Sequence, residues 1–372
     1  MPTLTDRSRM AAMFDCPRLR WNRYHAEGTG LTAKSEKLAL VAGNWLHQGI
    51  ESLFGGEGID RAIEVAHDRW WELVESCQDT PHFAAEQRTL LEGLLRCWAI
   101  ERLPKIREEF DLVLAEQELI WPMAPDIHDM LRVDALLRRR SGGGLYYLEV
   151  KSTSTGGDRW AASWQRHSQL LANVPAIEET LGERCEGVMI EGIVKGRRAK
   201  DRDSRSPTFE EKVQQSPLCY MWINEATGEE SAEYQRAKDW RKVPTWEHLP
   251  IAEWVSKLSP EVRAKQFSPV PPITPQRAQL VRFRRQAVAQ ERLVAQAIEW
   301  LGSEEARDPE RREFIMDTCF PLNDNHCRRF LDYPCEFEAL CFTPEIEADP
   351  LGSGLYERRV PHHPAELEER VR

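Results

Sequence analysis

A short stretch of the chain places an acid and a base where a buried strand would normally carry apolar side chains. Residues 145–153 read LYYLEVKST, so Glu149 and Lys151 lie two residues apart among aromatic and aliphatic neighbours. In a strand, residues i and i+2 point to the same face. Because burying a charge is costly unless the charge is paired or binds a metal, these two residues need a partner or a function.

A second acid, Asp134, lies in the preceding predicted strand, MLRVDALLRRR. The intervening SGGG predicts a hairpin, and a turn centred between Ser141 and Gly142 places Asp134 directly opposite Glu149. Opposed residues have Cβ atoms about 4.5–5.5 Å apart. Two carboxylates at that distance repel each other unless a cation lies between them.

The chemistry that this arrangement favours is metal-dependent hydrolysis of a phosphate ester. Oxygen ligands suit Mg²⁺ or Mn²⁺, which bind through a few carboxylates and keep water molecules for a substrate phosphate. Such an ion polarises a phosphoryl oxygen and lowers the pKa of a bound water. Lys151 could orient that water or stabilise developing negative charge. The alternative is a cross-strand salt bridge at a sheet edge, and the hairpin alone leaves both interpretations open.

The elements around the hairpin predict a mixed α/β fold. Apolar periodicity predicts helices at 36–53, 59–77, 84–109, 160–181 (interrupted at Pro175) and about 276–302. Alternation predicts strands at 111–121, 130–140, 145–151, 185–196 and 217–224. Residues 225–275 have no regular pattern and end in a proline-rich linker, FSPVPPITP. This order of elements favours a mixed sheet with a helical layer.

The predicted organisation has five parts along the chain. They are an N-terminal helical region (1–110), a core (111–226), a helical insertion or linker (227–318), a cysteine-containing segment (319–345) and a polar tail (346–372).

The composition is that of a soluble globular protein. Hydrophobic residues make up 41% and charged residues 30% of the 372 positions, and no apolar run approaches the length of a membrane span. The first residues lack the apolar region of a secretory signal, so we expect a cytoplasmic protein without a membrane partner. The net charge of −11 argues against a non-specific DNA coat protein but leaves room for an enzyme with a local basic groove.

Four of the nine cysteines form a second candidate site. Cys327, Cys335 and Cys341 lie close together near the C-terminus, and Cys16 lies far upstream in FDCPRLRW. Four thiolates can saturate a tetrahedral site for zinc or for an iron–sulfur cluster. Zinc sites usually use closer Cys pairs than these, so the spacing favours a cluster. Cys319 is a spare that could replace one ligand. We expect the other cysteines to be core residues: Cys77, Cys97, Cys185 and Cys219.

The combination of these motifs resembles a known family. Asp134, followed after a glycine turn by Glu149-Val150-Lys151, resembles the D…(D/E)-x-K signature of the PD-(D/E)XK nuclease superfamily, although Val133 replaces the proline of that name. Cys16-Pro17-Arg18 with the C-terminal triplet looks like the RecB-like iron–sulfur exonuclease branch, in particular its phage-type members.

The resemblance implies a restriction-endonuclease-like fold, with a mixed β-sheet core flanked by helices. It also implies a [4Fe–4S] cluster that closes the N- and C-terminal regions, with zinc as the alternative. The cluster ligands would be Cys16, Cys327, Cys335 and Cys341.

The resemblance also assigns supporting residues. His47, in a helix before the strands, corresponds to a metal ligand beside Asp134 and Glu149, and Gln169 corresponds to a glutamine that contacts the site or DNA. In relatives a glutamate on the strand that carries Glu116 and Glu118 can approach the site, but for these two residues we expect a solvent-facing strand edge. The densest basic run, 195–205, is a candidate for contacts with backbone phosphates.

The implied function is that of a deoxyribonuclease dependent on Mg²⁺ or Mn²⁺, most often an exonuclease in recombination, repair or phage DNA processing. Its partners would be DNA, with single-stranded ends among the candidate substrates, and a helicase or recombinase. Two alternatives remain: an inactive DNA-end-binding adaptor with the same fold, and a zinc-stabilised structural protein.

Overall fold

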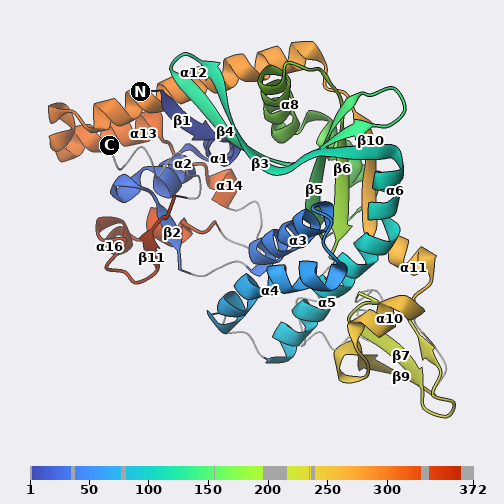
Figure 1. Cartoon of the computed structure of the whole chain (residues 1–372). Helices are drawn as coiled ribbons and strands as arrows, with labels where there is room; N and C mark the ends of the chain where they lie inside the picture. Colours follow the sequence, from blue (N-terminus) through green and yellow to red (C-terminus); the bar gives the residue numbers. More distant parts are fainter. Residues whose placement is uncertain are drawn as a thin grey trace.

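The fold is built on a mixed β-sheet whose strands come from widely separated parts of the chain (Figure 1). The computed structural model describes residues 2–34, 38–76, 81–154, 156–195, 216–233, 235, 239–327 and 335–361. The six strands of the main sheet are β1 (Thr3–Asp6), β3 (Phe110–Ala124), β4 (Ile127–Arg139), β5 (Leu145–Thr153), β6 (Cys185–Val194) and β10 (Phe267–Ile273). The chain is therefore a mixed α/β protein, as its pattern predicts.

The predicted hairpin is present with the predicted register. β3, β4 and β5 are consecutive antiparallel strands, and the turn between β4 and β5 uses Gly142 and Gly143 at φ 93° and 76°, which glycine adopts without steric cost. The β4–β5 pairs run from Arg138–Leu145 to Ala135–Leu148. In this register the next residues along are Asp134 and Glu149.

β4 changes partners along one of its edges. β3 follows the first edge and pairs with both Met130 and Ala135. The second edge is shared, because β1 pairs in parallel with residues 127–130 and β5 pairs antiparallel with residues 135–138. In the described part of the chain, no strand pairs with residues 131–134 on this edge. We call this gap between the end of β1 and the second half of β5 the fork.

Alternate residues of β5 pack into two different cores. Tyr146, Leu148 and Val150 pack with the helices of one layer, which are α3 (Leu38–Phe54), α4 (Ile59–Ser76), α5 (Pro81–Glu101) and α6 (Leu103–Glu109). Leu145 and Tyr147 pack with α8 (Ser168–Leu181) and α12 (Arg277–Leu301) on the other face (Figure 1). Alternation places Glu149 on the α8 side.

The proline-rich segment is a strand, so the prediction of a linker is wrong. β10 pairs antiparallel with β6 from Phe267–Ile193 to Val270–Ile190, and the register shifts before Ile273. β10 is the last strand of the sheet, where prolines are tolerated because one edge needs no donors.

The prediction of irregular structure over 225–275 is also wrong in its earlier part. A second sheet has the strand order β8 (Glu230–Ser231), β7 (Tyr220–Asn224), β9 (Trp240–Pro244). Two helices follow, α10 (Ile251–Lys257) and α11 (Pro260–Ala264). Leu218, Met221 and Trp254 of this region belong to the same core as α5.

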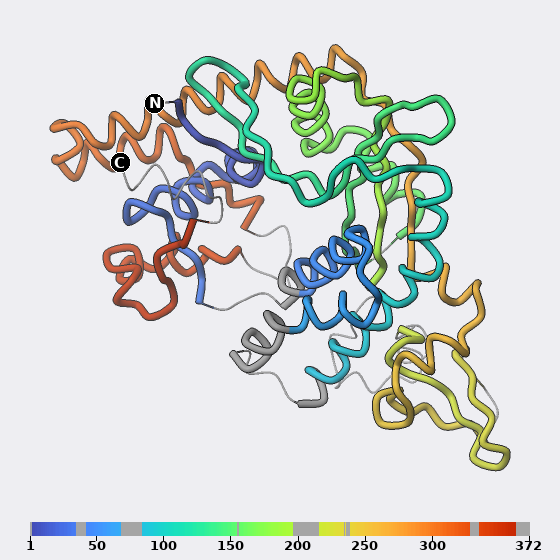
Figure 2. The backbone as a smooth tube through the Cα atoms, in the orientation of Figure 1, coloured from blue at the N-terminus to red at the C-terminus, as the bar shows by residue number. Residues whose placement is uncertain are grey.

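The two ends of the described chain lie side by side (Figure 2). β2 (Leu31–Ala33) pairs with β11 (Tyr356–Arg358), so residues 356–358 of the predicted polar tail belong to a small sheet. Helices α1 (Arg7–Asp15) and α2 (Pro17–Tyr24) lie beside the C-terminal helices, which are α13 (Pro309–Cys319), α14 (Asp324–Cys327), α15 (Glu338–Phe342) and α16 (Pro344–Ala348).

Direct polar contacts also join these ends. The Arg18 guanidinium donates to the Phe320 carbonyl at 2.9 Å, and Asn323 donates to the Asp15 carbonyl at 2.7 Å. No helix in the described part of the chain is long and apolar enough to cross a membrane.

A candidate metal centre and a group of cysteines

One group of possible metal ligands forms beside the fork. Within the described residues, one group has ligand atoms that all lie within 4.8 Å of one another. Its members are His47, Glu116 and Asp134. The Nδ1 atom of His47 is 3.6 Å from Oε1 of Glu116 and 3.6 Å from Oδ2 of Asp134. An imidazole with two carboxylates is a donor set that suits Mn²⁺ and other divalent ions that accept both nitrogen and oxygen.

Glu116 reaches this position through an unusual backbone conformation. The β3–β4 register pairs Ala115 with Ala135 and Gln117 with Val133, so Glu116 lies across from Asp134. Its φ of 48° is in the left-handed region, which costs a non-glycine residue on the order of 1–3 kcal/mol. The expectation of a solvent-facing edge is wrong for Glu116, whose side chain is 6% exposed, and right for the exposed Glu118.

Asp134 takes the place of a missing backbone partner at the fork. The ladder between β4 and β5 stops at Ala135–Leu148. Beyond that pair, Oδ2 of Asp134 accepts a hydrogen bond from the backbone N–H of Val150 at 2.7 Å. This bond ties the Asp134 carboxylate to β5 and holds it next to Glu149.

Glu149 is completely buried, and one of its oxygens has no partner. Its Oε1 accepts a hydrogen bond from Nε2 of Gln169 at 2.5 Å and is ion-paired with Lys151. Its Oε2 has no hydrogen-bond partner in the described structure. Burial and then the charge of Asp134 raise the pKa of Glu149 to about 7, although Lys151 opposes them. An unsatisfied oxygen of this kind is one that a cation could bind.

The charge of His47 also depends on its acidic neighbours. Burial on its own would lower the pKa of the imidazole. The negative charge of Asp134 and the contact with Glu116 outweigh burial, so the pKa of His47 is raised. A divalent cation bound at this site would compete with protons for these groups.

The residues predicted from the hairpin and the resemblance come together at the fork. Asp134, Glu149, Lys151 and Gln169 are connected through Glu149, and His47 contacts Asp134. The compact ligand group contains Glu116 and does not contain Glu149, so the role of Glu149 as a ligand stays a prediction.

Two functional candidates lie outside the residues that the sequence assigned to the site. The resemblance left room for a glutamate of this strand near the site, but Glu116 was expected at a solvent-facing edge because its positive φ breaks the alternation of the strand. Arg7 follows a strand of only four residues, and its Nη1 donates to Oε1 of Gln169 at 2.8 Å.

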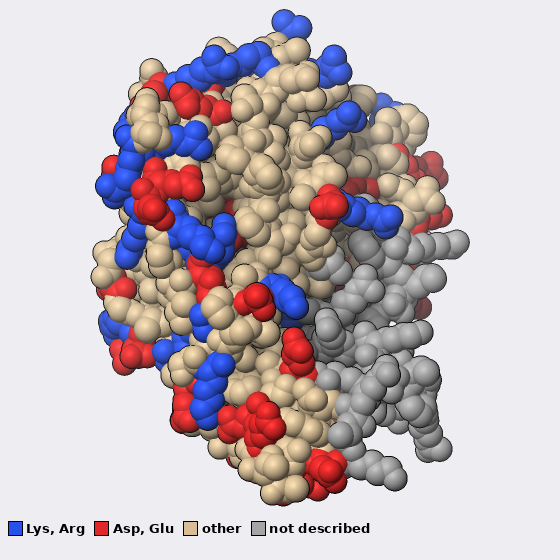
Figure 3. Space-filling model, turned by 90° about the vertical axis from the view of Figure 1, so that its right-hand side faces the viewer, with Lys and Arg blue, Asp and Glu red and all other residues tan. Residues whose placement is uncertain are grey.

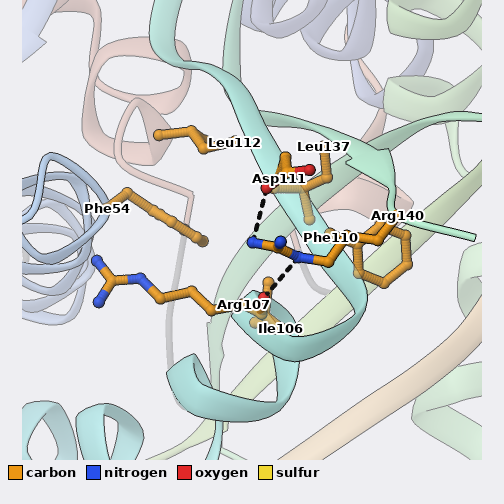
Figure 4. Close-up of a pocket in the computed structure, with 8 residues that line it drawn as sticks. All are labelled: Phe54, Ile106, Arg107, Phe110, Asp111, Leu112, Leu137 and Arg140. Atoms are coloured by element: carbon orange, nitrogen blue, oxygen red, sulfur yellow. Dashed lines mark hydrogen bonds and ion pairs between the residues drawn. The ribbon is translucent and has the colours of Figure 1, made fainter. Parts of the chain in front are cut away.

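The surface beside the centre is hollowed. An open depression of about 520 Å³ is lined in part by Glu116 and Arg132, and Nε of Arg132 is 2.6 Å from Oε2 of Glu116. A separate cavity of about 200 Å³ lies near the other end of β3, between Phe54, Arg107 and Leu112 (Figure 4). That cavity shares no residue with the fork site.

The four predicted cysteine ligands lie in one region. Cys16, Cys335 and Cys341 pack in one apolar core with Phe337 and Tyr356. Burial raises the pKa of Cys341 to about 12, and the charges of Cys335, Cys327 and Cys16 also act on it.

The thiols are nevertheless spread more widely than a zinc site requires. With Zn–S bonds of about 2.3 Å in a tetrahedron, zinc ligands lie about 3.8 Å apart. In the described chain, no group of three or more cysteines has its sulfurs all within 4.8 Å of one another.

The remaining cysteines have other surroundings. Cys319 packs beside Ile315 and Phe320, in a different apolar cluster from Cys16, Cys335 and Cys341, and burial raises its pKa. Cys97, Cys185 and Cys219 are buried in the two large cores, which confirms them as core residues. Cys77 lies outside the described residues.

Most of the basic run at 195–205 also lies outside the described residues, since only Lys195 is within them. On the face shown in Figure 3, basic and acidic side chains of the described residues are interspersed, with a broad area of other residues between them.

No protein-family description and no curated protein matches the chain. The function is therefore argued from its residues and geometry.

Proposed function

We propose that this protein is a metal-dependent nuclease that hydrolyses phosphodiester bonds in DNA. The observation that carries the proposal is the fork itself. Carboxylates from three neighbouring strands, Glu116, Asp134 and Glu149, meet there with the Lys151 ammonium and the His47 imidazole. The choice of DNA and of exonuclease action rests on the resemblance of these motifs to the PD-(D/E)XK superfamily.

The donor set fits Mn²⁺ or Mg²⁺. His47, Glu116 and Asp134 would hold the ion, and the unpartnered Oε2 of Glu149 is available as a further ligand. When bound, the ion would supply a bound water of low pKa and polarise a phosphoryl oxygen.

The protein groups prepare this chemistry. Gln169 and Lys151 both bind Oε1 of Glu149, which fixes the orientation of that carboxylate. Lys151 is 28% exposed, so its ammonium can also meet a substrate phosphate and stabilise negative charge that develops in the transition state.

We also propose that Cys16, Cys327, Cys335 and Cys341 hold an iron–sulfur cluster. The support is the chemistry of four thiols in one region, together with the wide sequence spacing of the cysteines. Asn22 donates to Sγ of Cys341 at 3.5 Å, a type of contact that tunes cluster potentials. The cluster would reinforce the closure of the chain ends without taking part in hydrolysis.

The nuclease proposal is tested with end-labelled single- and double-stranded DNA, Mn²⁺ and an EDTA control. We expect cleavage by the wild-type protein, loss of cleavage in Lys151→Ala with DNA binding retained, and normal cleavage in Lys257→Ala. Lys257 is a matched control because it pairs with Glu230, away from the fork. Binding of DNA without cleavage by the wild-type protein would support the inactive adaptor instead.

The cluster proposal is tested on anaerobically purified protein. We expect a brown colour and absorbance at about 400 nm, both lost in Cys335→Ser and retained in Cys319→Ser. Stoichiometric zinc without this absorbance would overturn the cluster.

A further inference from the structure

Arg7 lies at the opening of the fork. It is the first residue of α1 and directly follows Asp6, the last residue of β1. β1 runs parallel to β4 and ends beside Met130, while β5 leaves β4 after Leu148. The end of β1 therefore points toward the second half of β5, which carries Glu149 and Lys151.

The contact of Arg7 with Gln169 fixes the orientation of the amide. A guanidinium has only hydrogen-bond donors, so the Gln169 atom that faces Arg7 at 2.8 Å must be the oxygen. The amide nitrogen then faces Glu149, to which it donates at 2.5 Å. Arg7, Gln169 and Glu149 form a directed chain of hydrogen bonds from the N-terminal segment to the centre.

Arg7 keeps donors available beyond this chain. Its guanidinium has five N–H donors, it is half-buried, and its one hydrogen bond to the described residues is that to Gln169. No ion pair joins Arg7 to a carboxylate in the described part of the chain, in contrast to Arg18, Arg20 and Arg23 of the same segment. The neighbouring His167 has its pKa lowered to about 4 by burial and then by Arg7, so it is neutral at pH 7.

We infer that Arg7 is a phosphate-binding residue of this centre, with the DNA backbone as its ligand. The inference rests on the proposed nuclease function and extends it to a residue outside the recognised motif. The charge of Arg7 acts on Glu149 and Asp129, but neither forms a close ion pair with it. A guanidinium so placed beside a phosphodiester centre matches a phosphate in geometry and charge. Because Arg7 begins α1 and Cys16 directly follows the end of that helix, the position of this phosphate contact depends on the closure of the chain ends.

The test compares Arg7→Met, Arg7→Lys and Arg61→Met in the full chain. Arg61 is a matched control because it is exposed on α4 and pairs with Glu64. We expect Arg7→Met to lower the single-turnover cleavage rate on the order of 10²-fold, Arg7→Lys to recover part of it, and Arg61→Met to match the wild-type protein. Circular dichroism checks that each variant is folded.

DNA binding with Ca²⁺ in place of Mn²⁺ separates phosphate binding from a structural role. For single-stranded DNA, loss of one phosphate contact should flatten the slope of log K against log salt concentration by about 0.7. An unchanged slope and an unchanged rate in folded Arg7→Met would overturn the inference. If the wild-type protein binds DNA without cleaving it, the nuclease proposal fails, and the slope still decides whether Arg7 binds phosphate.

Discussion

At the residue scale, the centre depends on a glutamate in a conformation that strands avoid. Glu116 has a φ of 48° within the fifteen-residue strand β3. Such a conformation persists only where the surroundings enforce it, and contacts with Arg132 and His47 hold its two oxygens. The strain is consistent with a functional position, since strained residues concentrate at such sites.

We expect Glu116→Gln to weaken Mn²⁺ binding by about 10-fold or more, because it removes a charged ligand while keeping the shape of the side chain. Isothermal titration calorimetry measures the affinity. Glu118→Gln, an exposed change two residues further along the same strand, should leave the affinity unchanged. Equal affinities for the wild-type protein and Glu116→Gln would remove Glu116 from the ligand set.

At the element scale, the sequence predicts a strand pairing well when the residues that fix the pairing lie close together along the chain. The β4–β5 hairpin was predictable because alternation and a glycine turn fix its register within about twenty residues. That register placed Asp134, Glu149 and Lys151 correctly. Gln169 and His47 came from the family resemblance.

The fork could not be predicted from the sequence. β1 has four residues, and its partners in β4 are more than a hundred positions away along the chain. No local sequence pattern therefore indicates this strand, and Arg7, which follows it, was not predicted at the site either. β10 was missed because its prolines favour a linker unless the strand is known to lie at an edge. Both failures come from contacts between distant segments.

The contact between α2 and α12 contains a buried ion pair. Nη2 of Arg20 is 2.8 Å from Oε2 of Glu291, and the side chains are 2% and 0% exposed. Burial lowers the pKa of Arg20 and raises that of Glu291, so each charge depends on its partner.

We expect Arg20→Met to lower the free energy of unfolding by about 3–5 kcal/mol, because it leaves Glu291 buried without a counter-charge. The matched change Arg292→Met breaks an exposed pair with Asp126 and should lower the free energy of unfolding far less, because solvent screens this pair. Urea unfolding of both variants measures the difference. Equal losses in the free energy of unfolding would show that the buried Arg20–Glu291 pair contributes no more to stability than the exposed pair.

At the scale of the whole molecule, the polar layer between β1 and β4 makes stability depend on pH. Asp129 pairs with Thr5 across these strands, is 0% exposed, and has no hydrogen-bond partner for either carboxyl oxygen in the described structure. Burial, followed by the charges of Asp6 and Glu291, raises the pKa of Asp129 well above its ordinary value.

The sign of the pH effect follows from this shift. The folded state binds the Asp129 proton more tightly than the unfolded state, whose pKa is about 3.9. Protonation of Asp129 therefore stabilises the folded state fully at pH values below the pKa of the unfolded state. This stabilisation is lost as the pH rises toward the pKa of Asp129 in the folded protein. We expect Asp129→Asn to have a higher Tm than the wild-type protein at about pH 8, with the difference narrowing toward about pH 5.

Thermal unfolding at a series of pH values measures this difference. Asp126→Asn is the control, because the pKa of the exposed Asp126 is lowered by its hydrogen bond to Arg292. It should give no increase in Tm at high pH. A Tm difference for Asp129→Asn that does not vary with pH would contradict the assignment.

The pairing of β1 with β4, and of the first helices with the last, has a consequence for biosynthesis. β1 leaves the ribosome long before its partner at 127–130 is made, and Arg20 leaves it long before Glu291, with which it forms a buried ion pair. Such distant pairings form late. We expect the candidate centre to stay unassembled in a nascent chain until these distant segments have been made, so the nuclease activity that we propose would appear only after its supporting strands have paired.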